Sequence, residues 1–288
     1  MSTTTSETTP GAPTPRPRVA AELAPATPPG RGELRAAIAS ETTKMRSVRS
    51  TVWTLFATLA ATIGIGSLIA LARTSRWDRM SPIDKLTFDP TSFGLRGVFL
   101  AQLALGVLGV LVISSEYSTG MIRTTLTAVP RRVNMLAAKT IVFAVVAAVV
   151  SLVAVFAAFG ISQSIFASKH AGASLGDSGV LRAVVGAAVY LTAVGLMGIA
   201  LGTLLRRTAG AISTLFGFVF VLPALVSALP SPWDTNVGKY LPSATGRALF
   251  SVRQQSDLLS PGAALAVLAA YVVVSLGLAA LVLSRRDA

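Results

Sequence analysis

The residues best placed to do chemistry lie in one short polar stretch, Ser115–Arg132, between two long apolar runs. Its charged side chains are Glu116, Arg123, Arg131 and Arg132. A carboxylate at the end of an apolar run is costly unless it is hydrated or paired, so we expect one of the three arginines to pair with it. The stretch has neither the residues nor the spacing for catalysis. Its charges are suited to contact with another molecule.

The same stretch is expected to contain a turn and a short helix. Gly120 allows the chain to turn, and residues 120–128 are compatible with one short helix that Pro130 would help to end. A rigid helix of this kind could sit in a groove of a partner and transmit its movement to the apolar runs on either side. The alternative is a stop-transfer loop whose arginines only fix the topology.

Residues for other chemistries are missing from the sequence. Gly238-Lys239-Tyr240 is the nearest approach to a phosphate-binding loop and lacks its first glycine and its hydroxyl residue. The one histidine, His170, has no metal-ligand or catalytic motif around it, and the chain has no cysteine. We therefore predict no catalytic residue, no metal site, no cofactor bound by this chain and no enzymatic activity of its own.

The elements that position the polar stretch are apolar segments of membrane-spanning length. Of the 288 residues, 52% are hydrophobic and 13% are charged, which is too apolar for a soluble globular protein. Most of the segments reach the roughly 20 residues that a spanning helix needs, and none shows the alternation of a β-barrel. We expect spans at about 52–72, 97–115, 140–161, 181–204, 210–229 and 263–283. The fold class is thus an all-α integral membrane protein.

Basic residues indicate how the spans are oriented. With both termini in the cytoplasm, that side collects most of the arginines of the N-terminal region, the 115–139 stretch, Arg206-Arg207 and Arg285-Arg286. The bias is small, because the opposite side holds Arg73, Arg76, Arg79, Lys85, Arg96, Lys169, Arg182, Lys239, Arg247 and Arg253. Basic loops at a cytoplasmic face also explain the net charge of +13, so no nucleic-acid partner is expected.

Two regions precede the first span. Residues 1–30 are rich in Thr, Pro, Ala and Ser and are expected to be a disordered cytoplasmic tail. Residues 31–51 fit a basic amphipathic helix on a membrane surface, with Leu34, Ile38, Met45 and Val48 in one stripe that Glu41 interrupts. The charges Lys44, Arg46 and Arg49 are expected on its other faces. The alternative is a charged flank that only orients the first span.

The interiors of the expected spans are almost free of polar groups. Their centres carry no Asp, Glu, Lys or Arg, and Gln102 is the one strongly polar side chain placed well within a span. Ion-driven transporters normally need ionisable groups at depth, so an external energy source is favoured. Pro223 should kink the fifth span and is a candidate gate or hinge. Glycines at close-packing positions are Gly106, Gly109, Gly195, Gly198 and Gly202.

Two ordered motifs resemble those of ABC-2 type ABC transporter permeases. The first loop reads Glu-Tyr-x-x-Gly-x-x-x-x-x-Leu-x-x-x-Pro-Arg-Arg and is followed by Lys139; the upstream motif reads Ser-Glu-x-x-Lys-x-Arg-Ser-x-Arg-Ser-Thr over residues 40–51. With the apolar segments, the resemblance covers about residues 35–288. It implies a cytoplasmic coupling helix that docks on an ATPase, with coupling residues Glu116, Tyr117, Gly120, Arg123, Leu126, Pro130, Arg131, Arg132 and Lys139. It also implies an amphipathic connecting helix that carries Glu41, Lys44, Arg46 and Arg49.

The resemblance further implies an exporter subunit of the plasma membrane. Its partners would be membrane lipid, a second permease subunit (a homodimer) and two cytoplasmic ABC ATPase subunits that bind ATP and Mg. An apolar pathway without buried charge favours a hydrophobic or amphipathic substrate such as a drug, antibiotic, peptide or lipid. The alternative functions are a membrane assembly or sensor protein, or a membrane enzyme, without ATP-driven transport.

Overall fold

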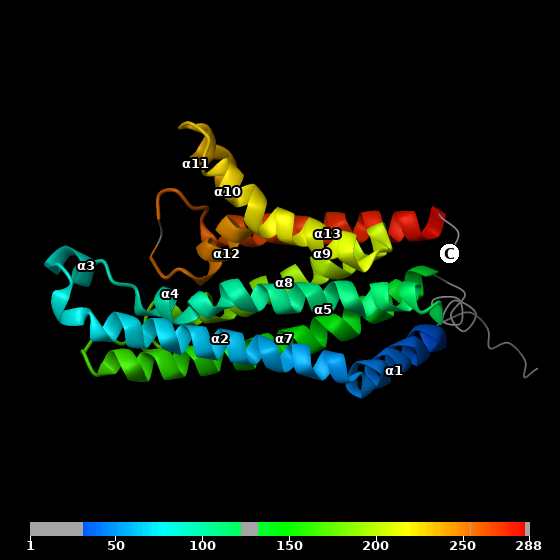
Figure 1. Ribbon diagram of the computed structural model, residues 1–288, viewed down its shortest axis with the longest axis horizontal. Helices are drawn as coiled ribbons and strands as arrows, with labels where there is room; N and C mark the ends of the chain where they lie inside the picture. Colours follow the sequence, from blue (N-terminus) through cyan, green and yellow to red (C-terminus); the bar gives the residue numbers. More distant parts are fainter. Residues whose placement is uncertain (1–30, 122–131, 254, 286–288) are drawn as a thin grey trace, which may run out of the picture.

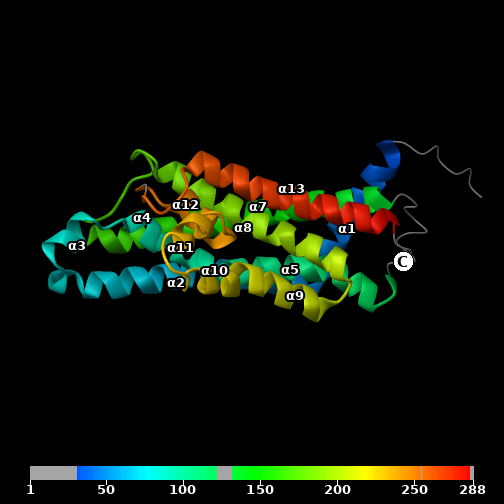
Figure 2. The ribbon, with the colours of Figure 1, turned by 90° about the horizontal axis from the view of Figure 1, so that it is seen from above.

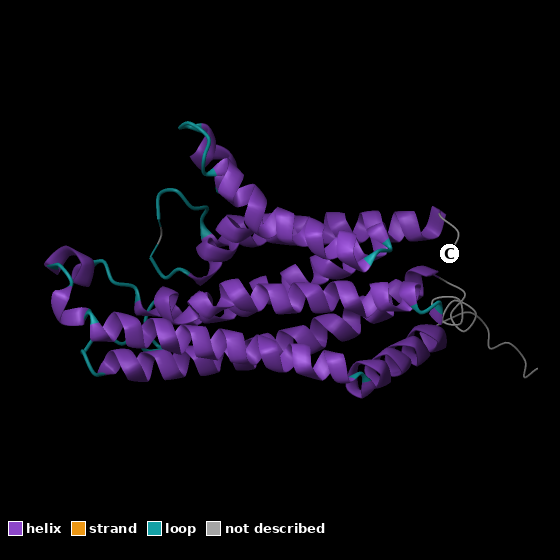
Figure 3. Ribbon diagram, in the orientation of Figure 1, coloured by secondary structure: helices purple, strands orange, loops and turns teal. Residues whose placement is uncertain are grey.

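In the computed structural model, the residues described are 31–121, 132–253 and 255–285, and within these ranges the chain is helical, without strands (Figure 3). The expected tail over residues 1–30 and most of the expected coupling helix lie outside the described residues. The long helices run side by side along one axis, and both views show this (Figures 1 and 2).

Six helices are long and apolar enough to cross a membrane. They are Arg49–Ser75 (α2), Pro90–Ser118 (α4, η2 and α5), Arg132–Ala167 (α7), Val180–Leu205 (α8), Thr208–Val226 (α9, η3 and α10) and Pro261–Arg285 (α13). Five of the six expected segments lie inside these helices, and the fifth span ends at Val226 instead of residue 229. The all-helical prediction is confirmed, and the six helices indicate a multi-pass membrane protein.

The N-terminal helix α1 (Arg31–Ser47) ends before the first long helix begins. Val48 has an extended backbone with φ −81° and ψ 110°, and α2 starts at Arg49. The break therefore lies at Val48, and the predicted continuation of the connecting helix to residue 51 is wrong. Helical periodicity runs unbroken through this region, so it could not locate a single extended residue. Figure 1 shows α1 set at an angle to α2, at one end of the bundle.

Helix α8 is the centre of the molecule. It contacts α5, α7, α9, α12 and α13, and more of its membrane-length window is buried than of any of the other five helices. The predicted close-packing glycines lie where α5 (Val98–Ser118) meets α8: a Cβ on Gly109 would strike the carbonyl of Gly195, and one on Gly198 would strike that of Gly106. These glycines thus pack two helices of the same chain against each other.

A buried hydrogen bond joins the same two helices. The Tyr190 hydroxyl of α8 donates to the Gln102 Oε1 of α5, and the Gln102 Nε2 donates to the Phe99 carbonyl at 2.8 Å. Both side chains are buried, so these bonds satisfy the polar groups that Gln102 brings into the apolar interior. The ring of Tyr190 also lies against Gly246 of the short helix α12 (Pro242–Phe250).

The fifth membrane-length helix is irregular where Pro223 enters it. The α-helical part α9 (Thr208–Phe216) is followed by a π-helical segment, η3 (Gly217–Val221), and then by α10 (Leu222–Val226), which contains Pro223. Proline has no N–H to donate to the carbonyl one turn earlier, and its ring crowds that carbonyl. The regular α-helical hydrogen bonds are therefore interrupted in the preceding turn. In Figure 1, α10 bends away from the line of α9, as a proline kink predicts.

Short helices fill the connections at the end of the bundle opposite α1. After α2 come η1 (Trp77–Arg79) and α3 (Pro82–Leu86), and α11 (Trp233–Gly238) and α12 follow α10. The N-caps of α3 and α4 (Pro90–Gly94) are Ser81 and Asp89, each followed by a proline at the first helical position. Both α11 and α12 (Pro242–Phe250) thus lie in the connection between the fifth and the sixth membrane-length helices.

Candidate functional site

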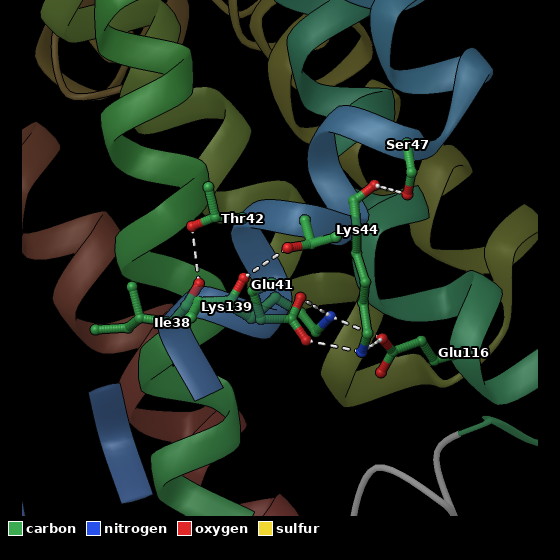
Figure 4. Close-up of polar contacts among 9 residues, drawn as sticks. Ile38, Glu41, Thr42, Lys44, Ser47, Glu116 and Lys139 are labelled. Atoms are coloured by element: carbon green, nitrogen blue, oxygen red, sulfur yellow. Dashed lines mark hydrogen bonds and ion pairs between the residues drawn. The ribbon is translucent and has the colours of Figure 1, made fainter. Parts of the chain in front are cut away.

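Four charged side chains from three separate helices meet at the end of the bundle that carries α1. They are Glu41 and Lys44 of α1, Glu116 of α5 and Lys139 of α7, and we call them the charge cluster (Figure 4). Lys139 Nζ lies 2.7 Å from Glu41 Oε2 and 3.0 Å from Glu116 Oε1. Lys44 Nζ lies 2.9 Å from Glu41 Oε1 and 2.8 Å from Glu116 Oε1. Each ammonium group therefore bridges both carboxylates.

The charge cluster is electrically neutral and largely shielded from solvent. Lys139, Glu41 and Glu116 are only 2%, 4% and 5% exposed. Within the described part of the chain, Glu116 Oε2 is buried and accepts no hydrogen bond. Removing one member would leave an uncompensated charge in this environment, which typically costs about 3–5 kcal/mol. The cluster thus fixes α1 against the ends of α5 and α7.

The sequence of α1 explains how two of these charges are presented. Ala37, Glu41 and Met45 are four residues apart and are all buried, so they form the face that packs against α7. Lys44 lies one turn after Glu41 and reaches the cluster from the edge of this face, whereas Arg46 and Arg49 are exposed. Glu41 therefore belongs to the buried stripe, and the prediction that it interrupts this stripe is wrong.

Two electrostatic effects oppose each other at Lys44. Partial burial acts to lower the pKa of its ammonium group, but hydrogen bonds to Glu116 and Glu41 outweigh burial and raise that pKa above the usual lysine value of 10.5. Lys44 is therefore charged at neutral pH, as its role between two carboxylates requires.

Glu116 has two partners that were not expected from the sequence, the ammonium groups of Lys44 and Lys139. Pairing with an arginine stays a prediction for Arg123 and Arg131. Of the arginines, Arg123 and Arg131 lie outside the described residues, and Arg132 donates from Nη1 to the Leu283 carbonyl at 3.3 Å. Because α7 begins at Arg132 and not near residue 140, Lys139 lies two turns inside that helix, where its side chain faces Glu116.

The other predicted coupling residues are only partly described. The guanidinium group of Arg206 lies 5.4 Å from the ring centre of Tyr117, which joins the end of α8 to the end of α5. Gly120 has φ 72°, the left-handed conformation that glycine adopts without strain, so the chain turns there. Leu126 and Pro130 lie outside the described residues.

A cavity of about 300 Å³ lies beside the charge cluster. Its lining joins the four charged residues to apolar side chains: Met45, Val48, Leu108, Leu111 and Val112. It therefore provides a polar end and an apolar wall between α1 and α5. Within the described residues, no group of three or more His, Asp or Glu side chains could hold a metal ion.

All four members of the charge cluster are among the residues singled out in the sequence, but no sequence feature places them together. A signal was available: Glu116 and Lys139 each border an apolar run, and buried charges of opposite sign require partners. Glu41 and Lys139 are 98 residues apart in the sequence, so no spacing pattern could predict that they pair.

Comparison with known proteins places the chain in a family. Residues 95–288, more than half of the chain, match a family described as protein of unknown function, DUF2705. The match includes Glu116 and Lys139 and begins after Glu41 and Lys44. No curated protein matches the chain. The chain therefore belongs to the DUF2705 family of proteins of unknown function.

Proposed function

We propose that this chain is the permease subunit of an ATP-driven exporter of the ABC-2 type and that the charge cluster couples it to an ATPase. The observation that carries the proposal is the junction of Glu41, Glu116 and Lys139. It ties α1 to the two helices that flank residues 119–131, where the coupling loop is expected. A force applied to that loop or to α1 would reach the membrane helices through buried ion pairs.

The position of the charges supports an external energy source. Glu116 lies two residues before the end of α5, and Lys139 lies seven residues after the start of the 36-residue helix α7. From Lys139 to Ala167, α7 still extends about 42 Å at 1.5 Å per residue, more than the roughly 30 Å hydrocarbon core. Both charges therefore lie near one membrane face and pair with each other, so they are poorly placed to carry a coupling ion across the core.

The proposed assembly follows from this arrangement and from the family resemblance. Two permease chains, as a homodimer in the plasma membrane, would associate with two cytoplasmic ATPase subunits that bind ATP and Mg. The start of α1 and the end of α13 lie at the same end of the bundle as the charge cluster, which supports a cytoplasmic position for both termini (Figure 1). ATP binding would draw the ATPase pair together and move the loop, α5 and α7.

An apolar groove supports a hydrophobic or amphipathic substrate. A cavity of about 360 Å³ lies between α7, α8 and α13, and Thr192 is the one polar side chain in a lining of Ala, Val and Leu residues. Apolar cavities of this size bind ligands mainly by burial of apolar surface. The groove is therefore our candidate for part of the substrate pathway.

The test is co-purification in mild detergent with a candidate ABC ATPase, followed by an assay of ATP hydrolysis. We expect the native chain to bind and stimulate the ATPase. Reversing one charge by Lys139→Glu should abolish the stimulation, and the exchange Glu41→Lys with Lys139→Glu should restore part of it. A second variant replaces Glu116 of the charge cluster together with Arg123 and Arg131 of the expected coupling loop by Ala, and it should also fail to stimulate the ATPase.

The matched control is Asp78→Asn, which breaks the exposed ion pair of Asp78 with Lys169 at the opposite end of the bundle. It should bind and stimulate the ATPase like the native chain. Equal stimulation by the native chain and Lys139→Glu would disprove the role of the charge cluster. Failure of the native chain to bind any ATPase would disprove the exporter assignment.

A further inference from the structure

Four arginines surround one cavity at the end of the bundle opposite the charge cluster. We call this cavity the arginine pocket; it measures about 660 Å³, and its basic residues are Arg73, Arg76, Arg79 and Arg96. They come from the last turn of α2, the residue that caps it, η1 and η2 (Leu95–Gly97). Segments before and after α3 thus converge on the same space.

The arginine pocket carries an excess of positive charge. Its lining contains four guanidinium groups and one carboxylate, Asp84, which accepts a hydrogen bond from the Ser81 hydroxyl at 2.8 Å. Within the described part of the chain, none of the four arginines forms an ion pair with a carboxylate. The neighbouring Asp78 pairs with Lys169, and Asp89 accepts hydrogen bonds from Ser92. Like charges repel each other, so a bound anion would stabilise this arrangement.

Two of the guanidinium groups are held in place by an aromatic ring. The Cζ atoms of Arg73 and Arg96 lie 4.3 and 4.2 Å from the centre of the Phe93 ring. Phe93 is itself stacked on Phe88 at 5.1 Å, in a small cluster that includes Phe166. Stacking on an aromatic face orients the planar guanidinium while its N–H groups remain available to a ligand. This pre-organisation distinguishes the pocket from a set of independent surface arginines.

The remaining walls indicate the kind of anion. Ile69 and Ala72 of α2 and Met80 are apolar, and Leu68 and Leu71, in the same turns of α2, are 65% and 53% exposed. The arginines therefore lie where a membrane-exposed helix ends, with an apolar surface leading away from them. Arginine binds phosphate oxygens in a bidentate manner, and an amphiphile could place its chain along α2.

We propose that the arginine pocket binds a phosphate-bearing anion, and that its source is the headgroup of an anionic lipid whose acyl chain lies along Leu68 and Leu71. This site is separate from the proposed ATPase contact and does not depend on it. It also gives a reason for the basic residues on the side of the membrane where topology alone would disfavour them.

The experiment measures thermal stability of the purified full-length chain in a nonionic detergent during titration with phosphatidylglycerol, phosphatidylcholine or inorganic phosphate. The first variant is Arg73→Gln with Arg96→Gln. The second is Arg76→Gln with Arg79→Gln, whose side chains are exposed, so it should fold even if loss of the Phe93 contacts destabilises the first. The matched control is Lys239→Gln, a basic residue outside the pocket lining, directly after α11.

We expect phosphatidylglycerol to stabilise the native chain and the Lys239 variant, with apparent affinity about tenfold weaker in either arginine variant. Phosphatidylcholine should have little effect, and added salt should weaken the binding. Equal stabilisation by inorganic phosphate through the same arginines would support the anion pocket and overturn its assignment to lipid. Identical titrations for all variants, or no stabilisation of the native chain, would overturn the proposal.

Discussion

Lys139 Nζ and Glu41 Oε2 lie 2.7 Å apart, although 98 residues separate them in the sequence. Both side chains are almost completely buried, so this ion pair joins α1 to α7 in an environment where neither charge could remain alone. The same lysine reaches Glu116 at 3.0 Å and so extends the junction to α5.

Substitution of Lys139 should therefore be strongly destabilising. Lys139→Met leaves Glu41 and Glu116 to share only Lys44, and we expect a loss of about 3–5 kcal/mol in the free energy of unfolding. The double variant Lys139→Met with Glu41→Gln should recover much of this loss, because it leaves one carboxylate and one ammonium group. The measurement is the SDS-induced unfolding of the purified protein, followed by tryptophan fluorescence.

The control for this prediction is Lys169→Met. Lys169 also forms an ion pair, but its partner Asp78 has an 80% exposed side chain, and exposed pairs contribute little to stability. If Lys139→Met unfolds at the same SDS concentration as Lys169→Met, the charge cluster does not hold α1 in place.

The contribution of Lys44 to the stability of the folded protein should be lost at high pH. The pKa of Lys44 is raised in the folded protein, so its contribution is fully present below the usual value of 10.5 and is lost as pH rises through the higher folded value. The difference in melting temperature between the native chain and Lys44→Met should stay constant from pH 7 to 9 and shrink above 10.5. A difference that shrinks between pH 7 and 9 would contradict the ion pairing described.

A methyl group at Gly198 should separate α5 from α8. Its Cβ would strike the backbone carbonyl of Gly106, which cannot rotate away, so we expect Gly198→Ala to reduce the free energy of unfolding by about 1–3 kcal/mol. Gly160→Ala is the matched control, because a Cβ there would meet no atom from elsewhere in the molecule within 4 Å and alanine favours the helix. Unfolding in SDS would compare them, and equal midpoints would contradict close packing at Gly198.

Loss of the Tyr190 hydroxyl alone should weaken the contact between α5 and α8. Tyr190→Phe removes the donor to Gln102 Oε1 and leaves that oxygen buried, which should cost about 1–2 kcal/mol. Changing both residues, as Gln102→Leu with Tyr190→Phe, should cost less than the sum of the two single changes. A double-mutant cycle of SDS unfolding measures this coupling, and additive effects would show that the bond contributes nothing.

Pro223 offers a test of motion in the proposed exporter. Pro223→Ala restores a backbone N–H to the Val219 carbonyl and should convert the π-helical segment into continuous α-helix. If the irregular segment is a hinge, transport should fall while ATPase binding remains. Leu222→Ala, which keeps the proline, is the control, and unchanged transport in Pro223→Ala would rule out the hinge.

The sequence alone determined the helical class and the six membrane-length segments. Long apolar runs without charge must form helices in lipid, because every backbone group has to be paired within its own segment. It also identified the glycines of the α5–α8 contact and the irregularity at Pro223, because glycine lacks a Cβ and proline lacks a backbone N–H. Each of these properties depends on one residue and its near neighbours in the chain, so it can be predicted from the sequence.

Only the tertiary structure decided which charges meet. The sequence offered several arginines near Glu116, and the lysines that bind it come from α1 and α7. The convergence of Arg73 and Arg96 on Phe93 was equally beyond sequence spacing. Such contacts depend on how far each helix is rotated about its own axis and shifted along it relative to its neighbours. The packing of all the helices together determines these rotations and shifts.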